Sequence, residues 1–213
     1  MELSWLEQLK LQPSWLLLLM FLGFLSLSRC SIAFLRWVFV TILRQPKNLK
    51  NYGSWAIITG STDGIGKAFA FELARKGLDL VLVGRNPGKL EAVSDEIGRE
   101  FRTTQVKKVV FDFDGDVSGG MERLEKEMEG LDVGVLVNNA GVTLPKARFF
   151  HEVDEGVWKS LIKINVRGMV KITKLVLPGM LQRKKGAIIN IGSAASIAIP
   201  SHPLYTIYAA TKA

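Results

Sequence analysis

The sequence predicts an α/β protein in which a Rossmann-type, doubly wound parallel sheet of about five strands follows an N-terminal transmembrane helix. After residue 54, short and uniformly apolar segments alternate with segments of helical spacing, a pattern typical of parallel sheets covered on both faces. A glycine-rich turn follows the first of these apolar segments, and a long uncharged run precedes it. With 213 residues, 48% of them hydrophobic and 23% charged, the chain can bury a core.

Composition narrows the function classes. A single cysteine, Cys30, excludes a disulfide framework, and two histidines leave little material for a metal centre. Residues 1–52 hold six Lys or Arg and two acids, so half of the net charge of +8 lies in a quarter of the chain. No nucleic-acid-binding motif accompanies this charge, which fits a basic segment beside a membrane. We therefore expect membrane lipid as a partner, and neither nucleic acid nor a metal.

The predicted membrane helix lies in an uncharged stretch of eighteen residues, 11–28, whose apolar run extends from Trp15 to Leu27. About 20 apolar residues cross a bilayer core, with about 17 as the lower limit. The span either ends near Arg29 or continues, tilted, to about Leu35, with Arg29 reaching back to the interface. The acids Glu2 and Glu7 and the lack of an Ala-x-Ala site favour an uncleaved anchor over a signal peptide.

The charges flanking this run predict its orientation. Two acids and one base precede the run, whereas five Lys or Arg and no acid lie between Arg29 and Lys50. The positive-inside bias then places everything after the span in the cytosol. We expect a membrane anchor with a basic segment at residues 1–44, a linker at 45–53 and a dinucleotide-binding domain at 54–213.

The domain is predicted to alternate strands and helices. Apolar runs predict strands at 55–59, 80–83, 108–111, 133–137 and 187–191. Helical spacing predicts helices at 65–76, 87–101, 118–130 and 154–177, the last ended by Pro178, and a further helix of about ten residues from Leu204.

The turn after the first strand has the context of a dinucleotide-binding loop, because it leaves a strand and opens a helix. Its residues are Gly60, Ser61, Thr62, Asp63, Gly64, Ile65 and Gly66. Gly60 permits a sharp exit from the strand, and Gly64 and Gly66 let the backbone approach a pyrophosphate. The free N–H groups at the start of the helix supply an anion site.

Four motifs occur in order: TGSTDGIG at 59–66, NNAG at 138–141, Asn165-Val166-x-Gly168, and Ser193 followed by Tyr208-x-x-x-Lys212. On these motifs the chain resembles the short-chain dehydrogenase/reductase family from Ser54 to its end. The resemblance implies that Asn139, Ala140 and Gly141 lie beside the point where the cofactor crosses the sheet, that Asn139 braces the central strand, and that Asp112 contacts adenine.

The resemblance also bears on the cofactor. An NAD enzyme would hold an acid after the second strand for the ribose 2′-hydroxyl, but Gly84, Arg85 and Asn86 include none. An arginine at this place can pair with a 2′-phosphate, so the sequence favours NADPH. The alternatives are that Arg85 is an ordinary surface charge and that Lys67 makes the phosphate contact.

The resemblance assigns four catalytic residues. Tyr208 and Lys212 are four apart, so on a helix they share one face. The lysine ammonium lowers the tyrosine pKa, which makes Tyr208 a proton donor to a developing alkoxide. Ser193 would hydrogen-bond the substrate carbonyl, and Asn165 would hold a water that links Lys212 to solvent. Tyr205 competes with Tyr208 but has Ala209, not lysine, four residues later.

Within the family, the N-terminal anchor and the segments 54–86 and 144–155 resemble the membrane-bound very-long-chain 3-oxoacyl-CoA reductases and the related 17β-hydroxysteroid dehydrogenases. This implies NADPH-dependent reduction of a 3-oxoacyl-CoA in fatty-acid elongation at the endoplasmic reticulum membrane, beside the other elongation enzymes. The alternatives are a steroid or other carbonyl reductase and a silent form that only binds cofactor or partners. Because the family's sheet continues beyond the Tyr208 helix, we expect an incomplete domain and weak activity for the 213-residue chain.

Overall fold

The computed structural model describes residues 13–45, 47–198 and 202–213. The chain forms two compact units, Met1–Lys47 and Asn48–Ala213. The second unit is an α/β domain built on a parallel five-stranded sheet, which confirms the predicted fold class. The residues Glu2, Glu7 and Lys10, on which the predicted orientation partly depends, lie outside the described residues.

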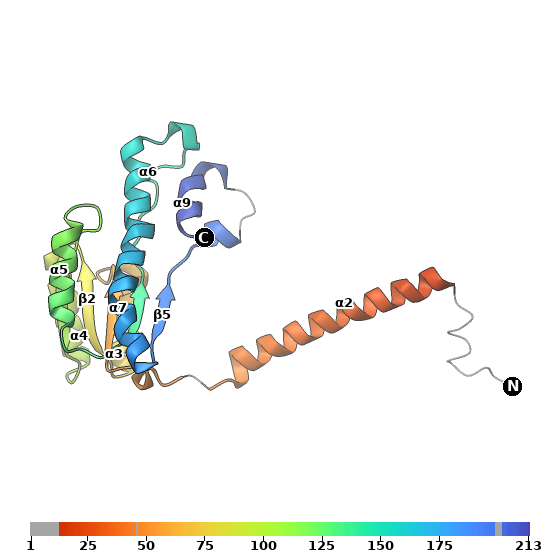
Figure 1. Ribbon diagram of the computed structural model, residues 1–213, viewed down its shortest axis with the longest axis horizontal. Helices are drawn as coiled ribbons and strands as arrows, with labels where there is room; N and C mark the ends of the chain where they lie inside the picture. The colour runs from red at the N-terminus through yellow and green to blue at the C-terminus, as the bar shows by residue number, and fades with distance from the viewer. Residues whose placement is uncertain (1–12, 46, 199–201) are drawn as a thin grey trace. The chain divides into compact units, whose positions relative to one another are not determined.

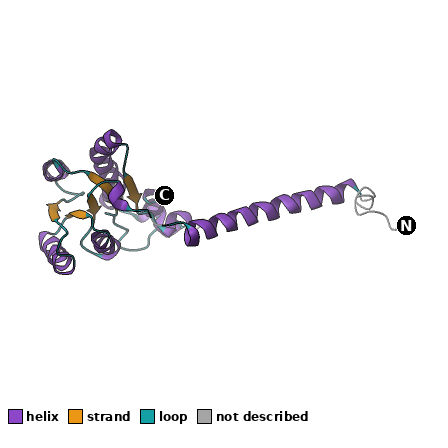
Figure 2. Ribbon diagram, turned by 90° about the horizontal axis from the view of Figure 1, so that it is seen from below, coloured by secondary structure: helices purple, strands orange, loops and turns teal. Residues whose placement is uncertain are grey.

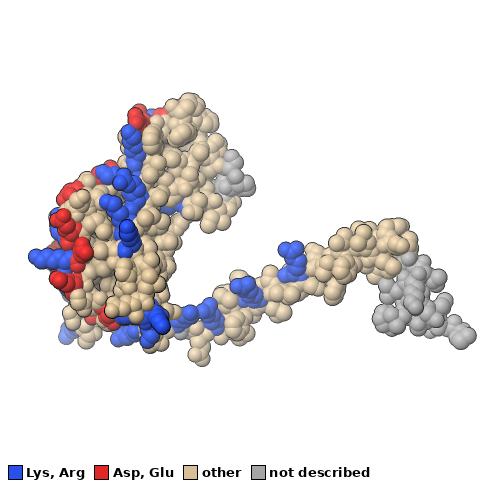
Figure 3. All heavy atoms as spheres, viewed as in Figure 1, with Lys and Arg blue, Asp and Glu red and all other residues tan. Residues whose placement is uncertain are grey.

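The first unit contains a long apolar helix. Helix α2 spans Ser14–Val38 and continues through a π-helical turn, Phe39–Leu43. The combined helix of 30 residues is long and apolar enough to cross a membrane. The helix continues beyond Arg29 and Leu35, the two predicted ends of the membrane span, because no proline or glycine interrupts residues 29–43. Charged atoms are sparse along it (Figure 3).

The sheet of the second unit has the strand order β3-β2-β1-β4-β5, and every neighbouring pair is parallel. Its strands are β1 (Trp55–Thr59), β2 (Asp79–Gly84), β3 (Val106–Val110), β4 (Val133–Asn138) and β5 (Ala187–Asn190). All residues of β1 and β4 are buried, whereas β5, at the edge, alternates between half-buried and exposed. The strand order reverses between β1 and β4, which makes their carboxyl ends the expected place for a ligand.

Helices cover both faces of this sheet (Figure 2). Helices α3 (Gly64–Arg75) and α4 (Pro87–Glu100) pack over one face, through a core that includes Ala70, Leu73 and Leu90. Helices α5 (Val117–Met128) and α7 (Met169–Arg183) cover the other through Leu124, Ile172 and Val176. Figure 1 shows α5 and α7 in front of the strands.

The long helix after β4 differs from the prediction. It consists of α6 (Glu155–Ile162), a π-helical segment (Lys163–Gly168) and α7, and it runs through Pro178 to Arg183. The predicted stop at Pro178 is therefore wrong. Val176 and Met180 pack on the sheet on either side of the proline, and Pro178 itself is exposed, so water can hydrate the carbonyl that lacks an amide partner.

The segment after β5 is made of short helices. Helix α8 spans Ala194–Ile197, a 3₁₀ turn spans Pro203–Tyr205, and α9 spans Thr206–Thr211. The predicted helix from Leu204 is thus a 3₁₀ turn followed by less than two turns of α-helix. None of these three elements contains a buried residue.

Candidate active site

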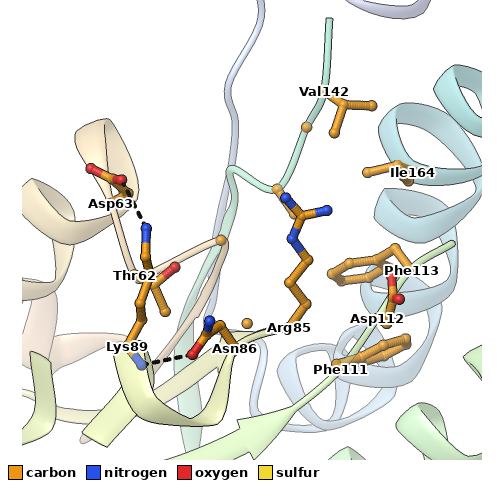
Figure 4. Close-up of a pocket in the computed structure, with 14 residues that line it drawn as sticks. Thr62, Asp63, Arg85, Asn86, Lys89, Phe111, Asp112, Phe113, Val142 and Ile164 are labelled. Atoms are coloured by element: carbon orange, nitrogen blue, oxygen red, sulfur yellow. Dashed lines mark hydrogen bonds and ion pairs between the residues drawn. The ribbon is translucent and has the colours of Figure 1, made fainter. Parts of the chain in front are cut away.

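A cavity of about 410 Å³ lies at the carboxyl ends of the strands (Figure 4). Five segments meet around it: the turn after β1, the β2–α4 junction, the residues after β3, the residues after β4, and the π-helical segment. The lining residues are Gly60, Thr62, Asp63, Gly84, Arg85, Asn86, Lys89, Phe111, Asp112, Phe113, Ala140, Gly141, Val142 and Ile164. The fold thus brings seven of the predicted cofactor residues to one cavity at the switch point.

The glycine-rich turn is closed tightly against its neighbours. Gly60 has φ +65°, a left-handed conformation that favours glycine. A Cβ atom on Gly66 would lie 2.2 Å from the Gly60 carbonyl oxygen and 2.4 Å from the Asn139 amide nitrogen. Asp63 begins α3 as its N-cap, since its carboxylate accepts a hydrogen bond of 2.8 Å from the Gly64 amide. The left-handed backbone at residue 60 and the lack of space at residue 66 therefore both favour glycine.

Hydrogen bonds join this turn to the one after β4. The Asn139 side-chain amide donates to the carbonyl oxygens of Thr59 and Gly60, each at 3.0 Å. The buried Thr59 hydroxyl accepts from the backbone amides of Asn139 and Ala140, also at 3.0 Å. Since Thr59 and Asn139 come from separate strands, these four bonds fix the two central turns relative to each other.

Charged side chains gather on the β2 side of the cavity. Arg85 extends across the cavity between the turn that holds Asp63 and the wall that holds Phe113 (Figure 4). The Lys89 ammonium lies 3.5 Å from the Asp63 carboxylate. The hydrogen bond from Gly64, followed by the charge of Lys89, lowers the pKa of Asp63. Within the described part of the chain, Arg85 forms no ion pair.

The other predicted cofactor residues do not line the cavity. Ser61 is fully buried, and its hydroxyl donates to the Val83 carbonyl at 3.3 Å, so its side chain serves the core. Gly64 and Ile65 lie in the exposed first turn of α3. Gly66 and Asn139 instead support the turns behind the cavity.

Lys212 lies at the end of the helix that holds Tyr208. Helix α9 ends at Thr211, and the Lys212 amide closes its last turn by donating to the Ala209 carbonyl oxygen at 3.1 Å. The Lys212 ammonium donates to the Ile191 carbonyl oxygen at 3.1 Å and lies where a Cβ on Gly141 would be 2.6 Å away. Burial lowers the pKa of Lys212. The half-buried Tyr208 ring packs edge-on against Tyr205, with ring centres 6.4 Å apart.

Asn165 is buried in the π-helical segment and connects three parts of the chain. Its side-chain oxygen accepts from the Val142 amide at 2.8 Å. Its side-chain nitrogen donates to the Val142 carbonyl and to the Thr211 hydroxyl, both at 2.9 Å. Asn165 therefore ties the cavity wall to α9, beside Lys212. π-Helical segments are frequent at functional sites.

Ser193 lies at the start of α8. Its hydroxyl accepts from the Ala195 amide at 3.2 Å. The Ser196 hydroxyl lies 2.7 Å from the Ser193 carbonyl oxygen and 2.8 Å from that of Lys212, which links the two chain segments. Among the described residues, no hydrogen bond joins the side chains of Ser193, Tyr208 and Lys212 to one another.

Sequence reasoning missed seven residues of the cavity: Gly84, Asn86, Lys89, Phe111, Phe113, Val142 and Ile164. Asn86 carries a readable signal, because an asparagine before Pro87 is typical of a helix start, and its side chain accepts from the Lys89 amide. Lys89 in that first turn then faces the glycine-rich turn. Phe111 and Phe113 carry no such signal in the sequence. Their rings stack with centres 4.3 Å apart, which is ordinary core packing.

Comparisons with known proteins agree with this geometry. The short chain dehydrogenase family model matches residues 54–213. A very-long-chain 3-oxoacyl-CoA reductase-like protein from Arabidopsis thaliana is 49% identical over 203 residues, covering 95% of this chain and 64% of that protein. The very-long-chain 3-oxoacyl-CoA reductase of Mus musculus is 44% identical over 163 residues, covering 76% of this chain and 51% of that protein. The chain thus spans about half to two thirds of the length of these relatives.

Solved structures share the fold. A short-chain dehydrogenase from Sphingobium yanoikuyae in complex with NADPH has a TM-score of 0.66 and 31% identity, covering 74% of this chain and 60% of that one. A 7β-hydroxysteroid dehydrogenase has a TM-score of 0.69 and 29% identity, covering 78% and 62%. Fold, motif order and family match agree, and the chain therefore belongs to the short-chain dehydrogenase family.

Proposed function

We propose that this chain is an NADPH-dependent reductase that converts a very-long-chain 3-oxoacyl-CoA to the 3-hydroxyacyl-CoA. The observation that carries the proposal is that the glycine-rich turn, Arg85 and the turn at 140–142 line one cavity, while Lys212 lies against Gly141 at its edge. The names of the relatives at 44–49% identity support the substrate class.

The residues present fit a phosphorylated dinucleotide. The close contacts at Gly60 and Gly66 keep side chains out of the turn, as the approach of a backbone to a pyrophosphate requires. Gly60, Thr62 and the first turn of α3 would hold the pyrophosphate, Asp112 the adenine end, Arg85 a 2′-phosphate, and Ala140 and Gly141 the nicotinamide half. When bound, NADPH supplies the hydride that reduces the carbonyl carbon.

The chain's own residues then handle the proton and orient the substrate. Tyr208 donates its phenolic proton to the carbonyl oxygen as negative charge develops there. The Lys212 ammonium stabilises the phenolate that Tyr208 leaves behind. Ser193 donates a hydrogen bond to the same oxygen and so orients the carbonyl. Asn165 holds α9 through Thr211 and would hold a water that links Lys212 to solvent.

Helix α2 supports a membrane location. We propose that it anchors the protein in the endoplasmic reticulum membrane, with the domain in the cytosol beside the other enzymes of fatty-acid elongation. The protein should stay with membranes during alkaline carbonate extraction, and protease added to intact microsomes should digest the domain. Protection of the domain from protease would overturn the orientation.

Cofactor binding and turnover test the reductase proposal. The full chain in detergent should quench its tryptophan fluorescence on binding NADPH, and NADPH oxidation should depend on an added 3-oxoacyl-CoA. A 17-ketosteroid serves as the competing substrate, because the sequence also resembles the 17β-hydroxysteroid dehydrogenases and a hydroxysteroid dehydrogenase is among the similar structures. Faster turnover of the steroid would replace the acyl-CoA assignment, and binding without any turnover would indicate a silent form.

A further inference from the structure

An acidic side chain stands at the lip of the cavity where the proposed ligand carries negative charge. Asp63 lies in the glycine-rich turn and lines the same cavity as Arg85. A carboxylate there repels a phosphate, so it opposes selection of a 2′-phosphorylated dinucleotide unless a cation compensates it. Asp112 is the second acid of the lining, and its carboxylate accepts from the Asp114 amide at 3.0 Å.

Lys89 is the cation that compensates Asp63. It projects from the first turn of α4, where the Asn86 side chain accepts from its backbone amide at 3.0 Å and so fixes the start of the helix. Its ammonium lies 3.5 Å from the Asp63 carboxylate and lines the cavity (Figure 4). The lining therefore holds two cations, Arg85 and Lys89, of which Lys89 is already paired.

The Asp63–Lys89 pair is easily exchanged. Its side chains are 83% and 58% exposed, and ion pairs this exposed contribute little net stability. A phosphate dianion is a stronger partner for an ammonium than one carboxylate oxygen at 3.5 Å. Lys89 can therefore move from Asp63 to a phosphate without a large loss elsewhere in the fold.

We propose that Lys89 is a second residue that determines cofactor specificity. When NADPH binds, Lys89 moves away from Asp63 and contacts the 2′-phosphate together with Arg85. The inference rests on the proposed function and assigns a role to a residue that sequence motifs do not mark. In this scheme Asp63 holds Lys89 at the lip in the free protein and weakens NADPH binding by its charge, while NADH, which lacks the phosphate, leaves the pair intact.

Lys67, the alternative phosphate contact from the sequence, fits less well. Its ammonium lies 2.7 Å from the Glu96 carboxylate, and Lys67 does not line the cavity. Lys108 provides a matched control for Lys89, since it also pairs with an acid, Glu91 at 2.8 Å, on an exposed surface outside the cavity.

Equilibrium binding of NADPH and NADH to the full chain in detergent tests the inference, by fluorescence titration of Lys89→Gln, Asp63→Asn, the double variant and the control Lys108→Gln. Lys89→Gln should raise the Kd for NADPH about 3- to 20-fold and change that for NADH less than about twofold. Asp63→Asn should lower the Kd for NADPH about threefold. The effect of Lys89→Gln should be larger in the Asp63→Asn background, because Lys89 no longer leaves a partner when it binds phosphate.

The outcomes separate this inference from the proposed function. If NADPH binds and Lys89→Gln changes its Kd no more than Lys108→Gln does, the role of Lys89 is overturned while the reductase proposal stands. An equal loss of affinity for NADPH and NADH in Lys89→Gln overturns it too, since Lys89 would then bind a part that both nucleotides share. If the unmodified chain binds neither nucleotide, both proposals fail. Thermal unfolding of each variant distinguishes lost binding from lost structure.

Discussion

The two ends of the proposed active site are built differently. At the cofactor end, Thr59 and Ser61 are 2% and 0% exposed, and four hydrogen bonds through Thr59 and Asn139 lock two turns together. At the catalytic end, α8 and α9 contain no buried residue, and Ile197 is 83% exposed. Single hydrogen bonds hold this end, among them those from Asn165 to Thr211 and from Lys212 to Ile191.

This difference has a physical origin in the sheet. The turns at the cofactor end leave the central strands β1 and β4, whose residues are all buried, so packing fixes their position. Of the predicted catalytic residues, Ser193, Tyr208 and Lys212 follow β5, an edge strand whose residues alternate between half-buried and exposed. Substitutions at the cofactor end should therefore mainly reduce stability, whereas those at the catalytic end should mainly reduce turnover and cost less stability.

The largest expected effect is on turnover, from Tyr208→Phe. Removing the phenolic hydroxyl removes the proposed proton donor, and general acid catalysis contributes about 10²- to 10⁴-fold. We expect kcat to fall by that factor, with the melting temperature and the Kd for NADPH unchanged. Tyr205→Phe is the matched control, because this neighbouring ring packs edge-on against Tyr208 and has no lysine four residues later. A similar loss in both variants would mean that the aromatic pair matters for packing.

Gly66→Ala should give the largest effect on stability. Its Cβ would lie 2.2 Å from the backbone oxygen of Gly60, so the turn must shift, and overpacking of this kind costs about 1–3 kcal/mol. NADPH binding should weaken in the same variant, because the shifted turn lines the cavity. In Gly98→Ala the new Cβ has nothing within 4 Å, and alanine inside α4 should raise the free energy of unfolding by about 0.5–1 kcal/mol. Chemical denaturation measures the change in the free energy of unfolding for both variants.

The parallel direction of the strands could be predicted from the sequence, because apolar runs that alternate with helices imply parallel pairing. The glycine-rich turn was predictable for the same reason, since its glycines follow a strand and open a helix. Both features depend on local sequence. The end of the helix after β4 was not predictable, because the packing of Val176 and Met180 on the sheet overrides the local effect of Pro178.

Contacts between distant segments account for the rest of what was missed. The approach of Lys89 to Asp63 spans 26 residues of sequence, and the hydrogen bond from Asn165 to Thr211 spans 46. Neither has a local pattern, because the α4 start and the π-helical segment reach these partners only through the sheet.

Thr211→Val sharpens the comparison at the catalytic end. The Thr211 hydroxyl accepts from the Asn165 side chain and donates to the Tyr208 carbonyl. Valine keeps the shape but loses both bonds, which should lower the free energy of unfolding by about 0.5–1.5 kcal/mol. We expect kcat to fall several-fold with an unchanged KM for NADPH. Thr206→Val removes a hydroxyl bonded at 2.9 Å to the Pro203 carbonyl, outside this network, and should leave kcat unchanged.

The smallest expected effect concerns the pH dependence of stability through Lys212. Burial lowers the pKa of Lys212 below its ordinary value of 10.5, so between the two values the unfolded chain binds more protons than the folded chain. Stability linked to Lys212 therefore rises as pH increases through the folded-state pKa toward 10.5, and the protonated lysine is the less favourable form at lower pH. The free energy of unfolding of the unmodified chain, minus that of Lys212→Met, should rise over this range. The rise should be small, because Lys212 is only half-buried and solvent screens its charge. A difference that falls with pH would show that Lys212 gains a stabilising anionic partner in the folded protein. The catalytic end would then be held more firmly than its single hydrogen bonds suggest, and the contrast with the cofactor end would be smaller.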